Sequence, residues 1–269
     1  MKIFWRRRRA AWSLLSKEQQ ADLLDCLLET GQQLLESGVE ISRVEDTISR
    51  IAKAYGARYT DVFVITSIIS ISLEFSDTDF VSEARRIYSS AGTDFNKLEK
   101  LNGLSRVVCN NPISLEDFHV SLSEIASMKK PFWLILIGSM LAAGSFAVFF
   151  GGSIYDGVAS VLFAIEICIC QNYLDKTKVS TAASNLLISL IIGLCVGLVC
   201  RAVPALHMDK ILIGDIMLLI PGLAMTNAVR NMLVGNTISG AVRLIESLIW
   251  AGALAGGFMT AIIIIDTIF

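Results

Sequence analysis

Several ionisable side chains lie within long apolar stretches of this sequence, and two of them support a first functional hypothesis. Glu166 lies midway along one stretch, and Asp215 lies near the end of another. Charged groups within a bilayer are costly and commonly serve proton relays or polar networks. We predict this role for both, although an interhelical hydrogen bond is the simpler alternative for Glu166. Arg243 and Glu246 lie one helical turn apart, so they can pair with each other. Alternatively, each side chain extends its charged end to the membrane–water interface.

A second group of residues surrounds the dipeptide Pro221-Gly222. Proline removes a backbone donor and glycine removes a conformational constraint, so together they predict a helix broken within the membrane. The backbone groups that such a break frees are tolerated where they line a cavity. We expect the dipeptide and the polar residues after it to form a substrate path, in which the arginine suits an anionic group: Thr226, Asn227, Arg230 and Asn231. A proline kink beside a loop arginine is the alternative.

The elements that must position these residues lie on both sides of a change in composition near residue 130. Most of the 23 Lys and Arg and the 25 Asp and Glu residues precede it. Five apolar stretches follow, each close to the roughly 20 residues that span a bilayer. We therefore predict a multi-pass α-helical membrane protein with a cytosolic α+β domain over 1–130 and a transmembrane domain over 131–269. The five expected helices cover 132–151, 154–174, 182–203, 209–227 and 241–265.

The first 130 residues show alternating helical and extended patterns. Apolar residues at helical spacing predict helices from Ser16 to Ser37 and from Ile41 to Tyr55. A period of two over 62–75 predicts one long strand or a pair, and 82–89 is a further strand candidate. Helices are expected over 94–109 and 114–127, which gives the order α-α-β-β-α-α. On the second helix, Asp46 and Arg50 are spaced for ordinary surface pairing, and a cytosolic gate is the alternative use of this cluster, with Arg43 and Glu45 as its candidates.

Basic residues indicate the orientation. Placing the N-terminus in the cytoplasm puts most of the loop Lys and Arg residues inside, as the positive-inside rule requires: Arg6 to Arg9, Lys129, Lys130, Lys176, Lys178, Arg230 and Arg243. The third loop, with Arg201 and Lys210, is the exception. With five spans the C-terminus lies outside, and a second five-helix copy would insert upside down, as in the inverted repeats of secondary transporters. We expect another chain to supply that second half.

Glycine spacing predicts where helices pack closely. Gly193-xxx-Gly197 and Gly252-xxx-Gly256 permit close approach of helix backbones. This pattern is common in membrane proteins, so it predicts helix association and nothing about substrate.

Several function classes are disfavoured. The net charge of −2 argues against nucleic acid as a partner. The six cysteines form no CxxC pair and only two histidines are present, so neither a metal site nor a disulfide framework is expected. We find no phosphate-binding glycine loop, nucleophile elbow or HExxH motif, so no cofactor, ATP-driven step or enzymatic activity is expected. No ring-forming charge pattern favours a channel.

Two stretches together resemble the threonine/serine exporter (ThrE) family, in particular its split, YjjP-like form. One is Gly31-xx-Leu34-Leu35-xx-Gly38-xxxx-Arg43-x-Glu45; the other runs from Pro221-Gly222 to Arg230 and then to Gly235 and Gly240. The resemblance implies a bacterial inner-membrane exporter of small metabolites, either threonine and serine or dicarboxylates such as succinate. It also implies a separate membrane partner similar to YjjB. Asn231 departs from the pattern, because an acidic residue is expected there in many relatives.

The sequence therefore predicts one half of a heteromeric secondary exporter that works in the lipid bilayer on a small-molecule substrate, with a homo-oligomer left open. A membrane-anchored ligand-sensing or regulatory subunit is the alternative. It predicts that Glu166 and the Pro221-Gly222 break are dispensable.

Overall fold

A computed structural model of the chain describes residues 15–76, 79–87, 94–129, 131–174, 176–177 and 179–268. The described residues fall into two compact units. The first runs to Met128 and also takes in Thr226–Arg243, and the second takes in the described parts of 129–225 and 244–269. The basic segment Arg6 to Arg9, and also Lys130 and Lys178, lie outside the described residues.

A three-stranded antiparallel sheet forms one layer of the first unit, in the order β1 (Tyr59–Ile65), β2 (Ile68–Ser76) and β3 (Asp79–Arg86). The period-two segment is thus a pair of strands, and the further strand candidate is β3. The turn between Ile65 and Ile68 explains why even-numbered Val64 and odd-numbered Ile69 are both buried, since a reversal shifts which positions face the core.

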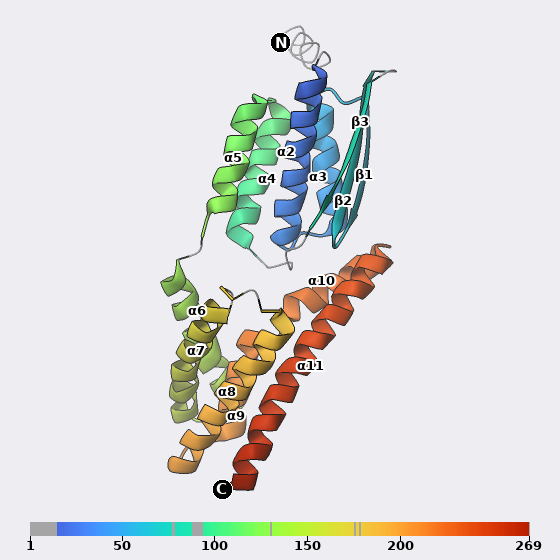
Figure 1. The fold of residues 1–269 in the computed structure, drawn as a ribbon. Coiled ribbons are helices and arrows are strands. Elements are labelled where there is room, and N and C mark those ends of the chain that lie inside the picture. Colours follow the sequence, from blue (N-terminus) through green and yellow to red (C-terminus); the bar gives the residue numbers. More distant parts are fainter. Residues whose placement is uncertain are drawn as a thin grey trace. The chain divides into compact units, whose positions relative to one another are not determined.

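Four helices of the first unit form layers beside this sheet. As Figure 1 shows, α2 (Lys17–Glu36) and α3 (Ile41–Ala54) lie against the sheet, and α4 (Phe95–Asn110) and α5 (Leu115–Ser127) pack on them from the other side. Side-chain caps fix three of the helix starts, because each satisfies backbone N–H groups that have no partner within the helix. The capping residues are Ser16, Asp94 and Ser114.

The structure explains why two positions in the stretch from Gly31 to Glu45 are glycine. A Cβ on Gly31 would lie 2.9 Å from Cδ1 of both Ile48 and Ile69, so glycine permits the close packing of α2 on α3 and β2. Gly38 has φ +86°, a conformation that other residues rarely adopt. Close packing therefore accounts for glycine at position 31, and the turn between α2 and α3 accounts for glycine at position 38.

Helices make up the second unit, which contains α6 (Phe132–Phe149), α7 (Ile154–Leu174), α8 (Thr181–Ala202), α9 (Met208–Leu219), the first residues of α10 (Gly222–Leu233) and most of α11 (Thr237–Ile268). Among the described residues, four helices are long and apolar enough to cross a membrane, or five if the bent α9–α10 pair is one span. The chain is therefore a multi-pass helical membrane protein. The span expected over 209–227 consists of two helices that meet at 53°, so the break expected at Pro221-Gly222 is confirmed.

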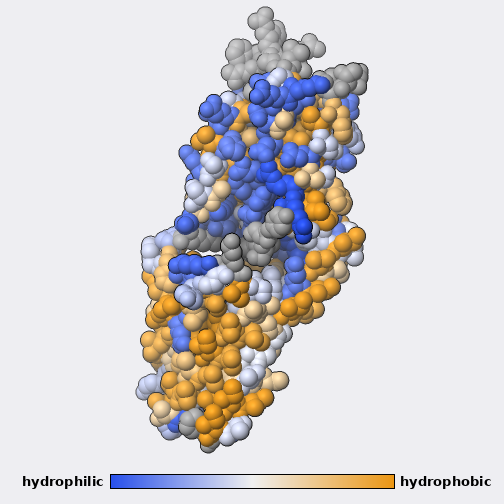
Figure 2. Space-filling view, in the orientation of Figure 1, coloured by the Kyte–Doolittle hydropathy of each residue, from blue (hydrophilic) through white to orange (hydrophobic). Residues whose placement is uncertain are grey.

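Most apolar side chains of the spanning helices face outward. Only 17% of the most apolar window of α6 and 28% of that of α11 are buried. Figure 2 shows a mostly hydrophobic visible face on the second unit, whereas hydrophilic residues take up a larger share of the first. Such a surface suits contact with lipid or with another apolar chain, because exposing apolar side chains to water costs free energy.

Helices α8 and α11 approach closely at glycines. A Cβ on Gly193 would lie 2.6 Å from Cβ of Ala261, and one on Gly197 would lie 2.6 Å from Cγ1 of Ile265. The first glycine pair thus packs as its spacing predicts. On α11 the close contact is made by Gly257, where an added Cβ would lie 2.6 Å from the Leu186 carbonyl oxygen.

Candidate functional site

The break between α9 and α10 has a local chemical cause. Pro221 has no N–H with which to continue the helix, and the Gly222 N–H instead donates to the Ile220 carbonyl over 2.8 Å. Helix α10 restarts with the Met225 N–H donating to the Pro221 carbonyl at 3.0 Å. The two residues therefore end one helix and begin the next.

The six residues expected in a substrate path are divided between the two units. Pro221 and Gly222 belong to the second unit, and the four polar residues after them belong to the first. Asn231 is 2% exposed, and its Nδ2 has no hydrogen-bond partner among the described residues. Thr226 also lies in the first unit, on an exposed part of α10.

Arg230 and Asn227 contact the loop that links α2 to α3. The Arg230 Nη1 atom lies 2.6 Å from Oε1 of Glu40, which is the residue before α3. Asn227 Nδ2 is 3.5 Å from the Gly38 carbonyl oxygen, at the outer limit of a hydrogen bond. Because Glu40 already neutralises Arg230, an anionic substrate would have to compete with this carboxylate.

Asp215 lies at the centre of the packing of α6, α7 and α9. Its side chain is fully buried, and Oδ1 accepts a 2.6 Å hydrogen bond from Ser160 Oγ of α7. The second oxygen, Oδ2, has no partner within the described part of the chain. A Cβ on the neighbouring Gly214 would lie 2.6 Å from the Ala143 carbonyl of α6, so the helices meet closely here. One carboxylate oxygen of Asp215 therefore accepts a hydrogen bond, and the other accepts none from a described residue.

Glu166 faces a largely apolar cavity of about 720 Å³ within the second unit. Its side chain is partly buried, and Oε1 accepts from Cys195 Sγ of α8 at 3.4 Å. Residues from α7, α8 and the segment before α9 line the cavity, among them Tyr155, Phe163 and Leu206. Glu166 is the one carboxylate among the lining residues that the structure describes.

Arg43 and Glu45 do not form a common site. Glu45 Oε1 accepts a 3.2 Å hydrogen bond from the Val64 N–H and so joins α3 to β1, and burial raises the pKa of its carboxyl. Arg43 instead lines a polar cavity between α3 and α4. At the start of the last helix, Arg243 is buried and Glu246 is exposed.

The family model described as "Putative threonine/serine exporter" (ThrE) matches residues 25–265. The chain belongs to the ThrE family. The resemblance based on the glycine and proline stretches is thereby confirmed, and the family is one of exporters rather than a class of enzymes.

Two relatives add detail to the ThrE assignment. The "Threonine/serine exporter" of Corynebacterium glutamicum is 21% identical over 251 residues, which is 91% of this chain and 51% of that protein. The "Probable succinate transporter subunit YjjP" of Klebsiella aerogenes is 20% identical over 229 residues, 84% of this chain and 88% of that protein. This ThrE chain thus spans about half the length of the first relative. No solved structure matches it.

Sequence reasoning missed Asp156, which is fully buried at the start of α7. Its Oδ2 accepts from the Ser153 N–H at 2.7 Å and lies 3.0 Å from His207 Nδ1, and Oδ1 accepts from the His207 N–H at 2.7 Å. Asp156 therefore caps α7 and fixes the segment before α9. The Ser153-x-x-Asp156 spacing, which resembles a capping box, is the signal that could have found it.

A metal-like cluster also arises from residues far apart in sequence. Ligand atoms of Asp25, Glu29 and His119 lie within 4.8 Å of one another. Arg85 already pairs with Asp25, and His119 lies 3.4 Å from Glu29. The Arg85–Asp25 ion pair and the contact of His119 with Glu29 account for the cluster without a metal.

Proposed function

We propose that this chain is one subunit of a secondary exporter of small metabolites, either threonine/serine-type amino acids or dicarboxylates such as succinate. The observation that carries the proposal is Asp215, a buried carboxylate held by Ser160 inside the membrane unit of a ThrE-family chain. Intramembrane carboxylates of this kind are typical of proton-coupled transporters.

Two carboxylates supply the coupling chemistry in this proposal. Asp215 has an unfilled acceptor at Oδ2 among the described residues, so a proton can bind there without breaking the bond from Ser160. Glu166 lies on the same helix as Ser160 and faces the apolar cavity, where it can serve as a second proton-carrying group. Loss and gain of protons at these two carboxylates would drive substrate release.

In the proposed exporter, the ion pair of Arg230 and Glu40 serves as the gate. Arg230 lies on α10, about two and a half turns after the break, and its partner Glu40 is the residue before α3 of the first unit. A carboxylate substrate presents the same group as Glu40, so it can exchange with Glu40 at the guanidinium. The residues after the break, including Asn227 and Asn231, would then form the substrate path.

A second membrane subunit completes the exporter in this proposal. The match covers 51% of the Corynebacterium exporter, and the Klebsiella relative is named a subunit. The outward apolar surface of α6 and α11 offers an area for such a partner, which we expect to be YjjB-like. We place the complex in the bacterial inner membrane, with the first unit in the cytoplasm.

A ligand-sensing subunit without transport of its own is the second candidate. The polar cavity between α3 and α4 favours it, because this cavity lies wholly within the first unit. Under this alternative, Asp215 and Glu166 serve packing, and their removal leaves transport unchanged.

Export from cells lacking the gene tests the proposal. Cells are loaded with a threonine-containing dipeptide or with succinate, and release is followed with this chain alone, with its YjjB-like partner, or with both. Release that needs both chains and falls with Glu166→Gln supports the exporter and identifies its substrate class. Equal release in every combination overturns it for these substrates and favours the sensing subunit.

A further inference from the structure

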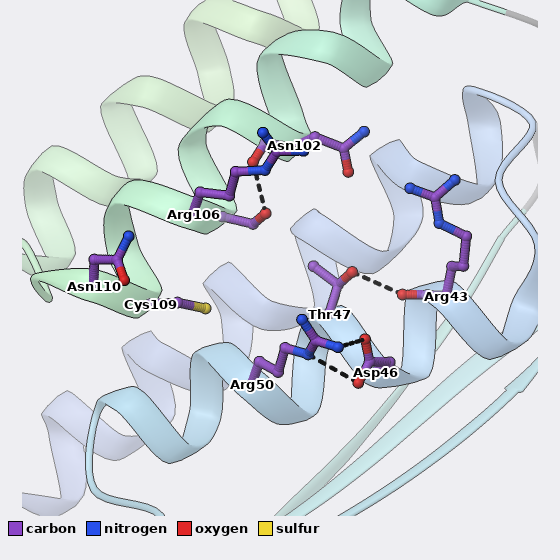
Figure 3. A pocket seen from close by; sticks show the side chains of 9 residues that line it. Arg43, Asp46, Thr47, Arg50, Asn102, Arg106, Cys109 and Asn110 are labelled. Carbon is purple, nitrogen blue, oxygen red and sulfur yellow. Dashed lines mark hydrogen bonds and ion pairs between the residues drawn. The ribbon is translucent and has the colours of Figure 1, made fainter.

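A polar cavity opens between α3 and α4 of the first unit (Figure 3). Its volume is about 420 Å³, within the range of small-molecule sites. Arg43 and Arg50 of α3 line it, as does Arg106 of α4. Asp46 is the carboxylate among its described lining residues, so three positive charges and one negative charge give the lining a net charge of +2.

Two of the three arginines have no anionic partner within the described part of the chain. Arg50 is bound to Asp46, with Nη2 at 2.7 Å from Oδ2 and Nε donating to Oδ1 at 2.9 Å. No carboxylate among the described residues pairs with Arg43 or Arg106. Figure 3 shows these two side chains on the helices that face each other across the cavity. The excess positive charge therefore comes from both walls.

The remaining polar groups make the lining rich in donors. Thr47 and Ser105 use their hydroxyl protons within their own helices, donating to the Arg43 carbonyl at 2.7 Å and to the Asn102 carbonyl at 3.0 Å. The side-chain amides of Asn102 and Asn110 also line the cavity and make no hydrogen bond with a described residue. Guanidinium and amide N–H groups are therefore available to a ligand that only accepts.

We propose that this cavity binds a small dianion, anchored by Arg43 from α3 and by Arg106 from α4. A dianion matches the net charge of the lining, and its oxygens accept from guanidinium and amide donors in the charge-assisted geometry that carboxylates and phosphates share. The ligand is thus either a short dicarboxylate or a compound bearing a free phosphate group. The inference does not depend on transport by the second unit.

Cys109 provides a local readout, because it lines the same cavity and is partly exposed. Burial raises the pKa of its thiol, so alkylation is measured at mildly alkaline pH, where enough thiolate is present.

The purified full chain is treated with an alkylating reagent in the presence of succinate, inorganic phosphate, acetate or sodium chloride at matched ionic strength. Mass spectrometry then follows each cysteine separately, with Cys200 of the second unit as internal reference. We expect succinate or phosphate to slow alkylation of Cys109 saturably, by roughly threefold or more, because the occupied cavity blocks access to the thiolate.

Variants that shift the half-protecting concentration in opposite directions distinguish ligand binding from a general disturbance of the fold. Arg43→Gln and Arg106→Gln each raise the half-protecting concentration by about tenfold, since each removes a charge-assisted hydrogen bond. Asp46→Asn lowers that concentration, because it releases Arg50 for the ligand. Lys53→Gln and Lys100→Gln are the matched controls on the same two helices, with the same charge change at exposed residues outside the lining.

Protection by succinate alone assigns a dicarboxylate, protection by phosphate alone assigns a phosphate group, and protection by both assigns a small dianion without further selectivity. Protection that acetate or chloride reproduces, that the lysine variants weaken equally, or that does not occur overturns the inference. The export assay is independent: a chain that binds the dianion but exports nothing loses the proposed function and keeps this site.

Discussion

Ser160 of α7 donates a 2.6 Å hydrogen bond to Oδ1 of Asp215 of α9, and both side chains are fully buried. The contact joins two helices whose surroundings are otherwise apolar, where an unpaired polar group is costly. In the proposed exporter, this bond holds the carboxylate in place and leaves its other oxygen to take up a proton.

Asp215→Asn should lower the export rate by about tenfold or more, because an amide keeps the shape and the bond from Ser160 but cannot exchange a proton. The measurement is export per amount of chain in the membrane. Ser160→Ala is the companion variant: it should lower stability by about 1–3 kcal/mol through loss of a buried donor while export keeps its pH dependence. Export by Asp215→Asn at the wild-type rate would contradict the coupling role.

Gly257→Ala should destabilise the second unit, since an added Cβ would lie 2.6 Å from the Leu186 carbonyl oxygen, a backbone atom that cannot move cheaply. Overpacking of this kind costs about 1–3 kcal/mol. Gly252→Ala on the same helix is the control, because nothing lies within 4 Å of its added Cβ. Thermal unfolding of the detergent-solubilised chain compares them, and equal unfolding temperatures would contradict the packing of α8 on α11.

Arg230→Gln should destabilise the first unit more than Glu40→Gln does. The Glu40 side chain is 13% exposed and would lose its cation, whereas the Arg230 side chain is 60% exposed and keeps its hydration. A double-mutant cycle on thermal unfolding should yield a coupling free energy of about 0.5 kcal/mol or more between contacting residues. Strictly additive effects would show that the two charges do not interact.

Glu45 provides a pH test in the first unit. Burial raises the pKa of its carboxyl, so the folded chain holds this proton to higher pH than the unfolded chain does. Its contribution to stability is therefore greatest below the unfolded pKa and is lost as pH rises through the folded pKa. Glu45→Gln stays neutral and can still accept from Val64, so its unfolding temperature relative to wild type should rise from about pH 4.5 to about pH 7.5. A difference that is constant with pH would contradict this account.

Periodicity and composition predicted the helices well, because apolar spacing reflects which face is buried. Capping residues such as Ser16 marked helix starts, and the break at Pro221 followed from the missing N–H. The pair of strands was left open because a period of two does not show where a chain reverses. The sheet turn between Ile65 and Ile68 became visible only through its register.

The polar contacts of the site could not be read from the sequence. Asp215 is 55 residues from Ser160, and Arg230 contacts Glu40 from the far end of the chain, so no local pattern links them. The division of the expected substrate path between two units has the same origin. Helical spacing aligned Asn227 with Arg230 on one face but did not show what that face contacts.

Flux into and out of lipid vesicles is the decisive test of the proposed exporter. This chain and its YjjB-like partner are reconstituted together, the vesicles are loaded with succinate or threonine, and release is measured with and without an imposed pH gradient. We expect release faster than from protein-free vesicles, acceleration by the gradient, and loss of that acceleration in Asp215→Asn. Release no faster than from protein-free vesicles for both solutes, or acceleration that Asp215→Asn retains in full, would contradict it.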